Sequence, residues 1–291
     1  MDRKKIDLTI SCYGKTKDEK YDVVILPWGA IEPHNFHLPY LTDCILPHDI
    51  AVDAAQLARE RAGIHCMVMP PVPFGAHNPG QRDLPFCIHT RQITRQYILE
   101  DIAASLYNQG IRRLVILGGH GGNDFKGMIR DLYIDYPDFL ILATNWFEII
   151  SGKDFFEAEI DDHAGESETS VMMYYHPELV KLSEAGNGEV KNFAIPSLNK
   201  KIAWTPRHWD KASTDSGIGN PRKASVEKGR DYAHAIVEKL ADLFLTLQNI
   251  SYINLYLISL FCLNMKVRLF FLATTSGKIS LTIFFEGIFG L

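Results

Sequence analysis

Two carboxylates and two imidazoles follow the first apolar segment of the chain within a run of sixteen residues. The apolar segment, residues 23–26, is typical of a buried strand. The run after it, residues 28–43, contains proline and glycine, which argue against a regular helix. Carboxylates and imidazoles in a loop at a strand end have the ligand chemistry of a divalent metal site, and the alternative is a polar surface loop. The residues concerned are Glu32, His34, His37 and Asp43.

A glycine-rich turn carries a further imidazole. Residues 118–123 read Gly-Gly-His-Gly-Gly-Asn, directly after a predicted strand. Such a turn can cradle phosphate, but a P-loop needs Lys and Ser or Thr after its last glycine, where this chain has Asn123 and Asp124. Asp124 also interrupts the dinucleotide-binding fingerprint. We therefore expect the glycines to let the backbone fold tightly around an inward-pointing His120, with a nucleotide-binding protein as the alternative.

Strands and helices alternate along the chain. Apolar runs predict strands at 21–27, 65–72, 113–117 and 139–144, and helical spacing predicts helices at 47–61, 91–109, 124–136 and 226–248. This alternation predicts an α/β fold in which helices flank both faces of a mainly parallel sheet. Sites in such sheets form at the carboxyl ends of the strands. Glu32, His34 and Asp43 follow the first strand and His120 follows the third, so they should meet at one edge, which favours the metal site.

Three other segments could complete a site. Residues 163–170 open a short predicted helix at 171–175, although acidic residues are ordinary at a helix N-terminus. The long loop at 73–90 predicts a functional segment, because such loops are uncommon in compact domains. The mostly irregular residues 181–221 could wall a pocket. In chain order, these segments contribute His77, Gln81, Arg82, Asp83 and His89, then His163, Glu166 and Glu168, then Trp204, His208 and Trp209.

Composition argues against several classes of protein. The chain has 291 residues, and its net charge of −5 comes without a basic block, which argues against a nucleic-acid partner. Five scattered cysteines form no Cys-x-x-Cys pair, and the first ten residues lack the apolar core of a signal peptide. We therefore expect a cytoplasmic protein with reduced cysteines.

The C-terminal segment differs from the rest of the chain. Residues 250–291 are apolar with few charges, and the uncharged run 243–265 is long enough to suggest a membrane span. Its polar residues and its continuity with an amphipathic helix argue against membrane insertion. We expect a single domain at 1–249 and an apolar extension at 250–291 that is covered by a partner or poorly ordered.

Three blocks of the sequence resemble the creatininase (creatinine amidohydrolase-like) family. Residues 29–43, Gly-Ala-Ile-Glu-Pro-His-Asn-Phe-His-Leu-Pro-Tyr-Leu-Thr-Asp, are similar to the family's Gly-Ser-x-Glu-Gln-His-Gly-Pro-His-Leu-Pro-x-x-Thr-Asp. Residues 119–123 resemble Gly-His-Gly-Gly-Asn, and residues 163–170 resemble His-Ala-Gly-x-x-Glu-Thr-Ser. The blocks occur in the family's order, and the resemblance covers about residues 20–245.

The resemblance implies a compact α/β sandwich, assembled as a homo-oligomer and usually a hexamer. It also implies a centre of two divalent metal ions per chain, which the ligand types would allow to be Zn, Mn or Fe. Asp43 matches the ligand that bridges both ions. The residues that match metal ligands are Glu32, His34, Asp43 and His120.

The fifth metal ligand is matched less well. In creatininase a Glu lies two residues after the His of the second block, and this chain has Gly122 there. We expect Glu166 to take its place, with Glu168 in reserve. His163 matches a histidine proposed for proton transfer, and His163 or Glu168 would protonate the leaving nitrogen. His37 either orients a ligand or makes a structural hydrogen bond.

The resemblance predicts a binuclear metal-dependent hydrolase. The expected reaction is hydrolysis of a C–N bond, in a cyclic amide or formamide, by a hydroxide that bridges the two ions. Substitutions in the first block, such as Pro33 and Asn35, and the Asp-Leu-Pro-Phe stretch at 83–86, put creatinine itself in doubt as the substrate. One alternative is a ring-opening or C–C hydrolase for a keto-inositol-like compound on the same metal centre. A second is a non-catalytic protein that binds a small ligand.

Overall fold

The computed structural model describes residues 2–248, 250, 255, 267–273 and 279–285. Its contacts divide the chain into two compact units, residues 1–249 and 250–291. In the second unit, β7 (Val267–Ala273) pairs antiparallel with β8 (Ile279–Phe285). The run 243–265 lies largely outside the described residues. Among the helices that are described, none has the length and apolar character needed to cross a membrane.

A four-stranded sheet lies at the centre of the first unit and confirms the predicted α/β class. Its order is β2-β1-β3-β4, and each neighbouring pair is parallel. The register pairs Trp28 with Gly118, so β1 and β3 end level with each other. The loops after these two strands therefore start side by side. The strands are β1 (Val23–Trp28), β2 (Cys66–Val68), β3 (Arg113–Gly118) and β4 (Leu140–Asn145).

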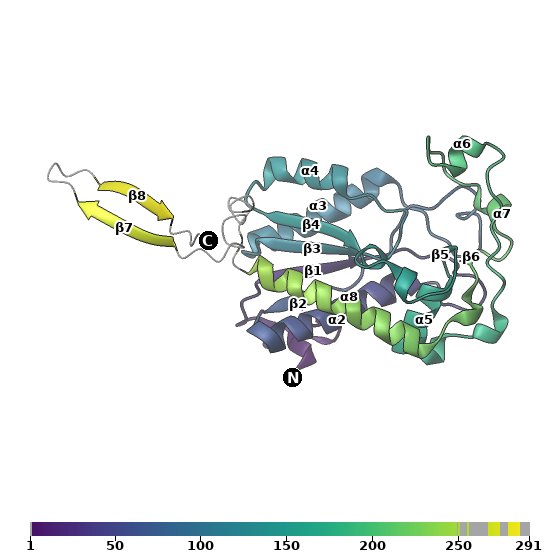
Figure 1. Ribbon diagram of the computed structural model, residues 1–291, viewed down its shortest axis with the longest axis horizontal. Helices are drawn as coiled ribbons and strands as arrows, with labels where there is room; N and C mark the ends of the chain where they lie inside the picture. The colour runs from purple at the N-terminus through teal and green to yellow at the C-terminus, as the bar shows by residue number, and fades with distance from the viewer. Residues whose placement is uncertain (1, 249, 251–254, 256–266, 274–278, 286–291) are drawn as a thin grey trace, which may run out of the picture. The chain divides into compact units, whose positions relative to one another are not determined.

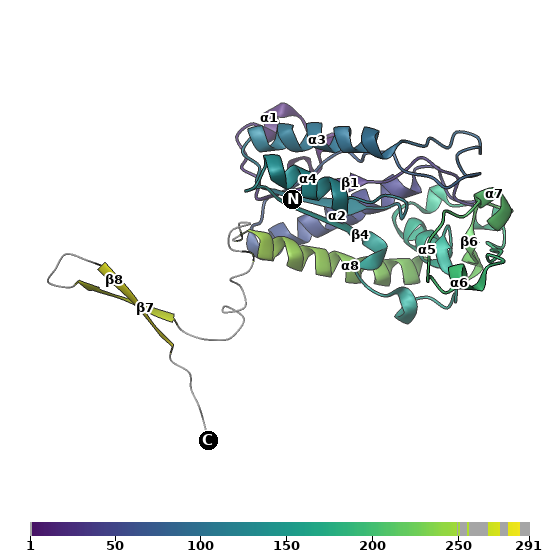
Figure 2. The ribbon, with the colours of Figure 1, turned by 90° about the horizontal axis from the view of Figure 1, so that it is seen from above.

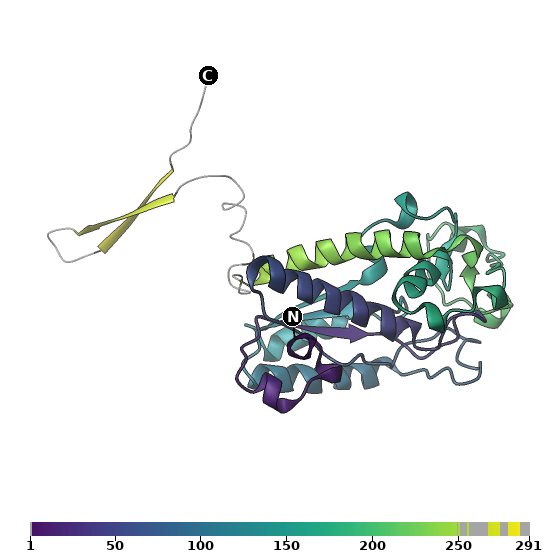
Figure 3. The same cartoon turned by 90° about the horizontal axis from the view of Figure 1, so that it is seen from below.

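Helices cover both faces of the sheet (Figures 1 and 2). On one face, α3 (Gln92–Asn108) and α4 (Lys126–Asp135) share an apolar core with the strands. On the other face, α2 (Thr42–Ala62) and α8 (Val226–Leu247) lie side by side (Figure 3). Helix α8 also packs against α5 (Glu166–Tyr175), which lies beyond the carboxyl ends of the strands together with the loops that follow them.

Short elements surround this frame. Beyond the carboxyl ends of the strands, β5 (Asp161–His163) pairs antiparallel with β6 (Ile218–Gly219). The other short α-helices are α1 (Tyr13–Thr16), α6 (Pro196–Asn199) and α7 (Trp209–Ala212). The 3₁₀ helices are Arg3–Lys5, Leu8–Ile10, Trp146–Glu148, Gly152–Asp154, Pro177–Leu179, Leu182–Glu184 and Pro221–Lys223.

Helix α2 begins at Thr42, five residues before the predicted start at Pro47. Proline lacks the N–H that would bond to the carbonyl of Asp43, so the first turn of the helix leaves that carbonyl free. The carbonyl instead packs against Gly29 and Gly119, where a Cβ atom would overlap its oxygen. The first turn of α2, which carries Asp43, therefore packs directly against the residues that follow β1 and β3.

Close packing between α5 and α8 depends on a glycine. A Cβ atom at Gly229 of α8 would overlap the carbonyl oxygen of Ser170 in α5. By contrast, a Cβ atom at Gly127 of α4 would meet no described atom within 4 Å. The two glycines therefore form a matched pair, one required by packing and one not.

We predict that Gly229→Ala lowers the free energy of unfolding by about 1–3 kcal/mol, the usual cost of overpacking. Gly127→Ala should be neutral or stabilising, because alanine is favoured over glycine in helices by about 0.5–1 kcal/mol. Urea unfolding of both variants measures this difference. Equal stabilities for the two variants would contradict the packing argument.

Candidate metal centre

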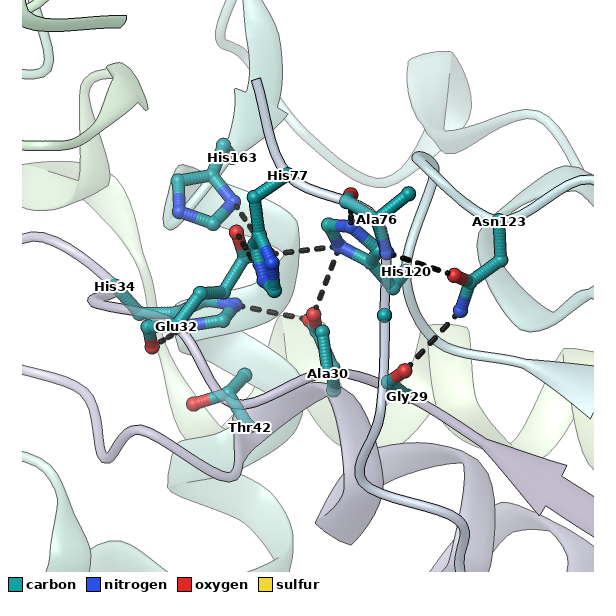
Figure 4. A network of polar contacts seen from close by, with 12 residues as sticks. Gly29, Ala30, Glu32, His34, Thr42, Ala76, His77, His120, Asn123 and His163 are labelled. Atoms are coloured by element: carbon teal, nitrogen blue, oxygen red, sulfur yellow. Dashed lines mark hydrogen bonds and ion pairs between the residues drawn. The ribbon is translucent and has the colours of Figure 1, made fainter. Parts of the chain in front are cut away.

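Four predicted ligands converge at the carboxyl ends of β1 and β3, and Figure 4 labels three of them, Glu32, His34 and His120. Glu32 and His34 are completely buried, and Asp43 and His120 are exposed by only 2% and 7%. They come from the loop after β1, the first turn of α2 and the loop after β3. The structure thus brings together the residues that the strand-end argument predicted to meet.

His34 presents a ring nitrogen to a carboxylate. Its Nδ1 lies 3.1 Å from the carbonyl oxygen of Glu32, which can only accept, so Nδ1 carries the proton. The neutral ring therefore has its lone pair on Nε2, which lies 2.9 Å from Oδ1 of Asp43. Two acceptors at this distance repel each other unless a proton or a metal ion lies between them.

His120 repeats this arrangement. Its Nε2 lies 2.6 Å from the carbonyl oxygen of Ala76 and donates to it. Its Nδ1 lies 2.8 Å from Oε1 of Glu32 and 3.1 Å from Oδ2 of Asp43, and within the described part of the chain neither oxygen has a hydrogen-bond partner. Metal-binding histidines almost always donate their second N–H to a carboxylate, a backbone carbonyl or water, and here the acceptor is a backbone carbonyl. The orphaned carboxylate oxygens and the oriented imidazoles therefore fit divalent metal ions.

The charges of the cluster support the same fit. Burial raises the pKa of Glu32 to about 6 and that of Glu168 to about 8, because the cost of desolvating these carboxylates outweighs the attraction of the nearby His120 and His34 rings. Burial alone would lower the pKa of His34, but the adjacent Asp43 carboxylate raises it to about 10. Divalent ions would supply the positive charge that the metal-free cluster can obtain only from protons.

Glu168, rather than Glu166, faces the cluster. Carboxylate and imidazole atoms of His34, Asp43 and Glu168 lie within 4.8 Å of one another, a spacing that suits one ion. Glu166 is buried elsewhere: Oε1 lies 2.5 Å from Nζ of Lys228, and Oε2 accepts from the backbone N–H groups of Glu157 and Ala158. The expectation that Glu166 completes the second metal is therefore not supported, because its oxygens already have partners. Glu168, the reserve, lies beside His34 and Asp43, where it could contribute to a metal site.

His163 lies beside the ligands. Its Nε2 donates to the carbonyl oxygen of Pro33 at 2.9 Å, so the lone pair is on Nδ1, 3.8 Å from Oε1 of Glu32. Burial lowers the pKa of His163 to about 3, which keeps the ring neutral. Trp209 packs edge-on against the ring with centroids 5.2 Å apart, which fixes its orientation.

The long loop at 73–90 contributes residues to which no role was given from the sequence. Gln81 donates to Oε2 of Glu32, and Nε2 of His77 lies 3.6 Å from the same oxygen. The length of the loop was the only sequence signal for this contribution. His37 contacts none of the candidate ligands; its Nε2 lies 2.8 Å from Oγ1 of Thr169, which favours the structural role.

The cluster opens into two cavities. The lining of the larger, about 1040 Å³, includes Glu32, His120 and His163. The smaller, about 370 Å³, also reaches Asp43 and Glu168. A small polar molecule would therefore have access to the candidate ligands. Trp204, His208 and Trp209, the residues expected to wall a pocket, all line the larger cavity.

Curated proteins of several activities are similar to this chain. Creatinine amidohydrolase of Pseudomonas putida is 25% identical over 76% of this chain and 87% of its own length. A mycofactocin precursor peptide peptidase of Mycobacterium ulcerans is 30% identical over 71% of this chain and 78% of its own. The 3-dehydro-scyllo-inosose hydrolase of Thermotoga maritima is 25% identical over 76% of each chain.

Solved structures share the fold. A Bacteroides fragilis protein, provisionally described as a creatinine amidohydrolase, is 72% identical, with a TM-score of 0.84 over 85% of this chain and 98% of its own. A mutant creatininase described as the Zn-Zn type is 23% identical, with a TM-score of 0.65 over 78% of this chain and 91% of its own. The family model Creatininase, described as creatinine amidohydrolase, matches residues 7–244. This chain therefore belongs to the creatininase family of amidohydrolases.

Proposed function

We propose that this protein is a metal-dependent amidohydrolase that hydrolyses a C–N bond, in a cyclic amide or a formamide, of a small polar substrate. The observation that carries the proposal is the orientation of His34 and His120, whose ring nitrogens point at carboxylate oxygens of Asp43 and Glu32 beside an open cavity. Membership of an amidohydrolase family supports the class of reaction.

The ligands would hold two divalent ions per chain. Glu32 and His120 would bind one ion, His34 and Glu168 the other, and Asp43 would contribute one oxygen to each. Such ions, when bound, lower the pKa of a water molecule and polarise a substrate carbonyl. The Zn-Zn type creatininase supports zinc, and mixed nitrogen and oxygen ligands also suit Mn or Fe.

His163 would move the proton. Its Nε2–H is held by the Pro33 carbonyl, so the lone pair on Nδ1 would take up the proton. The low pKa of the buried ring would favour return of this proton to the leaving nitrogen. Trp209 would hold the ring in this orientation. Glu168 was the alternative to His163 for protonating the leaving nitrogen. We assign it to the metal instead, because it lies beside His34 and Asp43.

The substrate class can be tested with the metal-loaded protein. The relatives hydrolyse different compounds, so cyclic amides, formamides, a keto-inositol and short peptides form the natural panel. Turnover of a cyclic amide or formamide supports the proposal. Turnover of the keto-inositol alone would transfer the assignment to a ring-opening or C–C hydrolase, and binding without turnover would favour a small-ligand-binding protein. Assembly as a homohexamer and a cytoplasmic location stay predictions from the sequence.

We predict that Asp43→Ala lowers both metal content and activity. Loss of an outer partner of a ligand typically costs 10–100-fold in metal affinity or activity, so loss of a shared ligand should cost more than about 100-fold. Elemental analysis per chain and initial rates measure the two effects. Asp53→Ala is the matched control, because Asp53 lies on the same helix but bonds to the Tyr175 hydroxyl at 2.9 Å. An Asp43→Ala protein with full metal and activity would refute the shared role.

The two glutamates of α5 should respond differently to the same change. We predict that Glu168→Gln lowers metal content with little effect on stability. Glu166→Gln should keep the metal and lower the free energy of unfolding by about 1–3 kcal/mol, because it weakens a buried pair with Lys228 and places an NH₂ group near backbone donors. Metal analysis and urea unfolding of both variants decide this. Metal loss only in Glu166→Gln would restore Glu166 as the fifth ligand.

A further inference from the structure

His77 lies inside the candidate centre but has no role in the proposed function. Its side chain is fully buried, and neither ring nitrogen has a hydrogen-bond partner among the residues that the structure describes. A neutral imidazole has one N–H to donate and one lone pair to offer, and buried polar groups are normally satisfied. A buried ring without partners therefore points to a ligand that the ring is placed to bind.

The backbone holds His77 rigidly in this position. A Cβ atom at Gly75 would lie 2.6 Å from Cβ of Ala30, so only glycine lets the loop lie so close to the end of β1. Ala76 accepts from His120 with its carbonyl and donates its N–H to Oδ1 of Asn123 at 3.2 Å (Figure 4). The same Asn123 donates to the carbonyl oxygen of Gly29 at 3.1 Å. The loops that carry Glu32, His77 and His120 are thus bonded to one another.

The distances suit a metal ligand. Atoms of Glu32, His77 and His120 that can bind a metal lie within 4.8 Å of one another. Nε2 of His77 lies 3.6 Å from Oε2 of Glu32, which is too far for a hydrogen bond. Two ligand atoms in tetrahedral positions about 2.1 Å from one zinc ion are roughly 3.4 Å apart. The separation of Nε2 of His77 and Oε2 of Glu32 is close to this value. Oε2 also accepts from Gln81, which steadies the Glu32 carboxylate.

His77 does not face the substrate. It is absent from the lining of both described cavities beside the cluster, whereas Glu32 and His120 line both of them. A role in substrate binding is therefore not supported by the geometry. The ring centroids of His77 and His120 lie 5.1 Å apart, so the fully buried His77 ring is a direct neighbour of a candidate ligand.

We propose that His77 is an additional metal ligand, which binds the same ion as Glu32 and His120. This inference rests on the proposed metal dependence. It makes the two metal positions unequal. Both positions would have two carboxylates, since Asp43 is shared. One has two imidazoles, His77 and His120, and the other has only His34. The first position should therefore bind zinc more tightly, because imidazole suits zinc better than it suits harder ions such as Mn²⁺.

The test is a zinc titration of the metal-free protein in competition with a chromophoric chelator. The wild-type protein should bind two zinc ions with different affinities. His77→Gln should weaken the tighter step by about 100-fold or more, beyond the 10–100-fold typical of outer-shell changes. His37→Gln, which removes another buried imidazole near the site, is the matched control and should leave both steps within about threefold of the wild type, since His37 bonds to Thr169 instead.

X-ray absorption at the zinc edge supplies a second readout that does not depend on activity. The wild-type protein should show three imidazoles shared by two ions, and His77→Gln should show two. If His77→Gln does not fold, His77→Gly supplies the test, because free imidazole should enter the vacated space and restore the tight step. Two zinc ions bound with unchanged affinity and imidazole count in His77→Gln would overturn this inference alone. A wild-type protein that binds no zinc would overturn the proposed metal dependence as well.

Discussion

Acceptor atoms that face one another inside the protein are the constraint on which the site depends. Neutral His34 and His120 both give their N–H to backbone carbonyls and turn their lone pairs toward carboxylate oxygens. This arrangement is unfavourable in a low-dielectric interior unless positive charge lies between the atoms. Protons can supply that charge, as the pKa of about 10 at His34 indicates. Divalent ions would supply it in the enzyme that we propose.

The fold enforces this constraint through close backbone approach. Because β1 and β3 end level with each other, the loops that follow these two strands start side by side. Gly29 and Gly119 admit the carbonyl of Asp43, and the first turn of α2 then points the Asp43 carboxylate between the two histidines. The imidazoles cannot turn away, because the carbonyls of Glu32 and Ala76 hold their outer nitrogens. The fold therefore keeps the lone pairs of the two histidines directed at the carboxylate oxygens of Asp43 and Glu32.

Much of this arrangement follows from the sequence, and the exceptions have physical reasons. The strands and the convergence of Glu32, His34, Asp43 and His120 were predictable, because parallel strands place their following loops at one edge. The choice between Glu166 and Glu168 was not. Residues two apart on a helix point about 200° apart, so one faces the site and the other faces α8, but spacing alone does not say which.

The early start of α2 and the role of His77 depend on tertiary contacts that leave little local signal. A proline usually marks the beginning of a helix, yet Pro47 is tolerated inside α2 because the carbonyl it leaves unpaired packs against two distant glycines. His77 lies in a long irregular loop whose path is set by bonds to Asn123 and by contact with Ala30. Neither partner is close in sequence, so periodicity and spacing carry no information about them.

The central claim is that the buried cluster holds two divalent ions that share Asp43. Anomalous diffraction from crystals of the protein loaded with zinc or manganese tests it most directly. The account predicts two anomalous peaks on opposite sides of the Asp43 carboxylate, one beside Glu32 and His120 and the other beside His34 and Glu168. Crystals of loaded protein without a peak in the cluster, or with an ion bound at Glu166 instead, would contradict it.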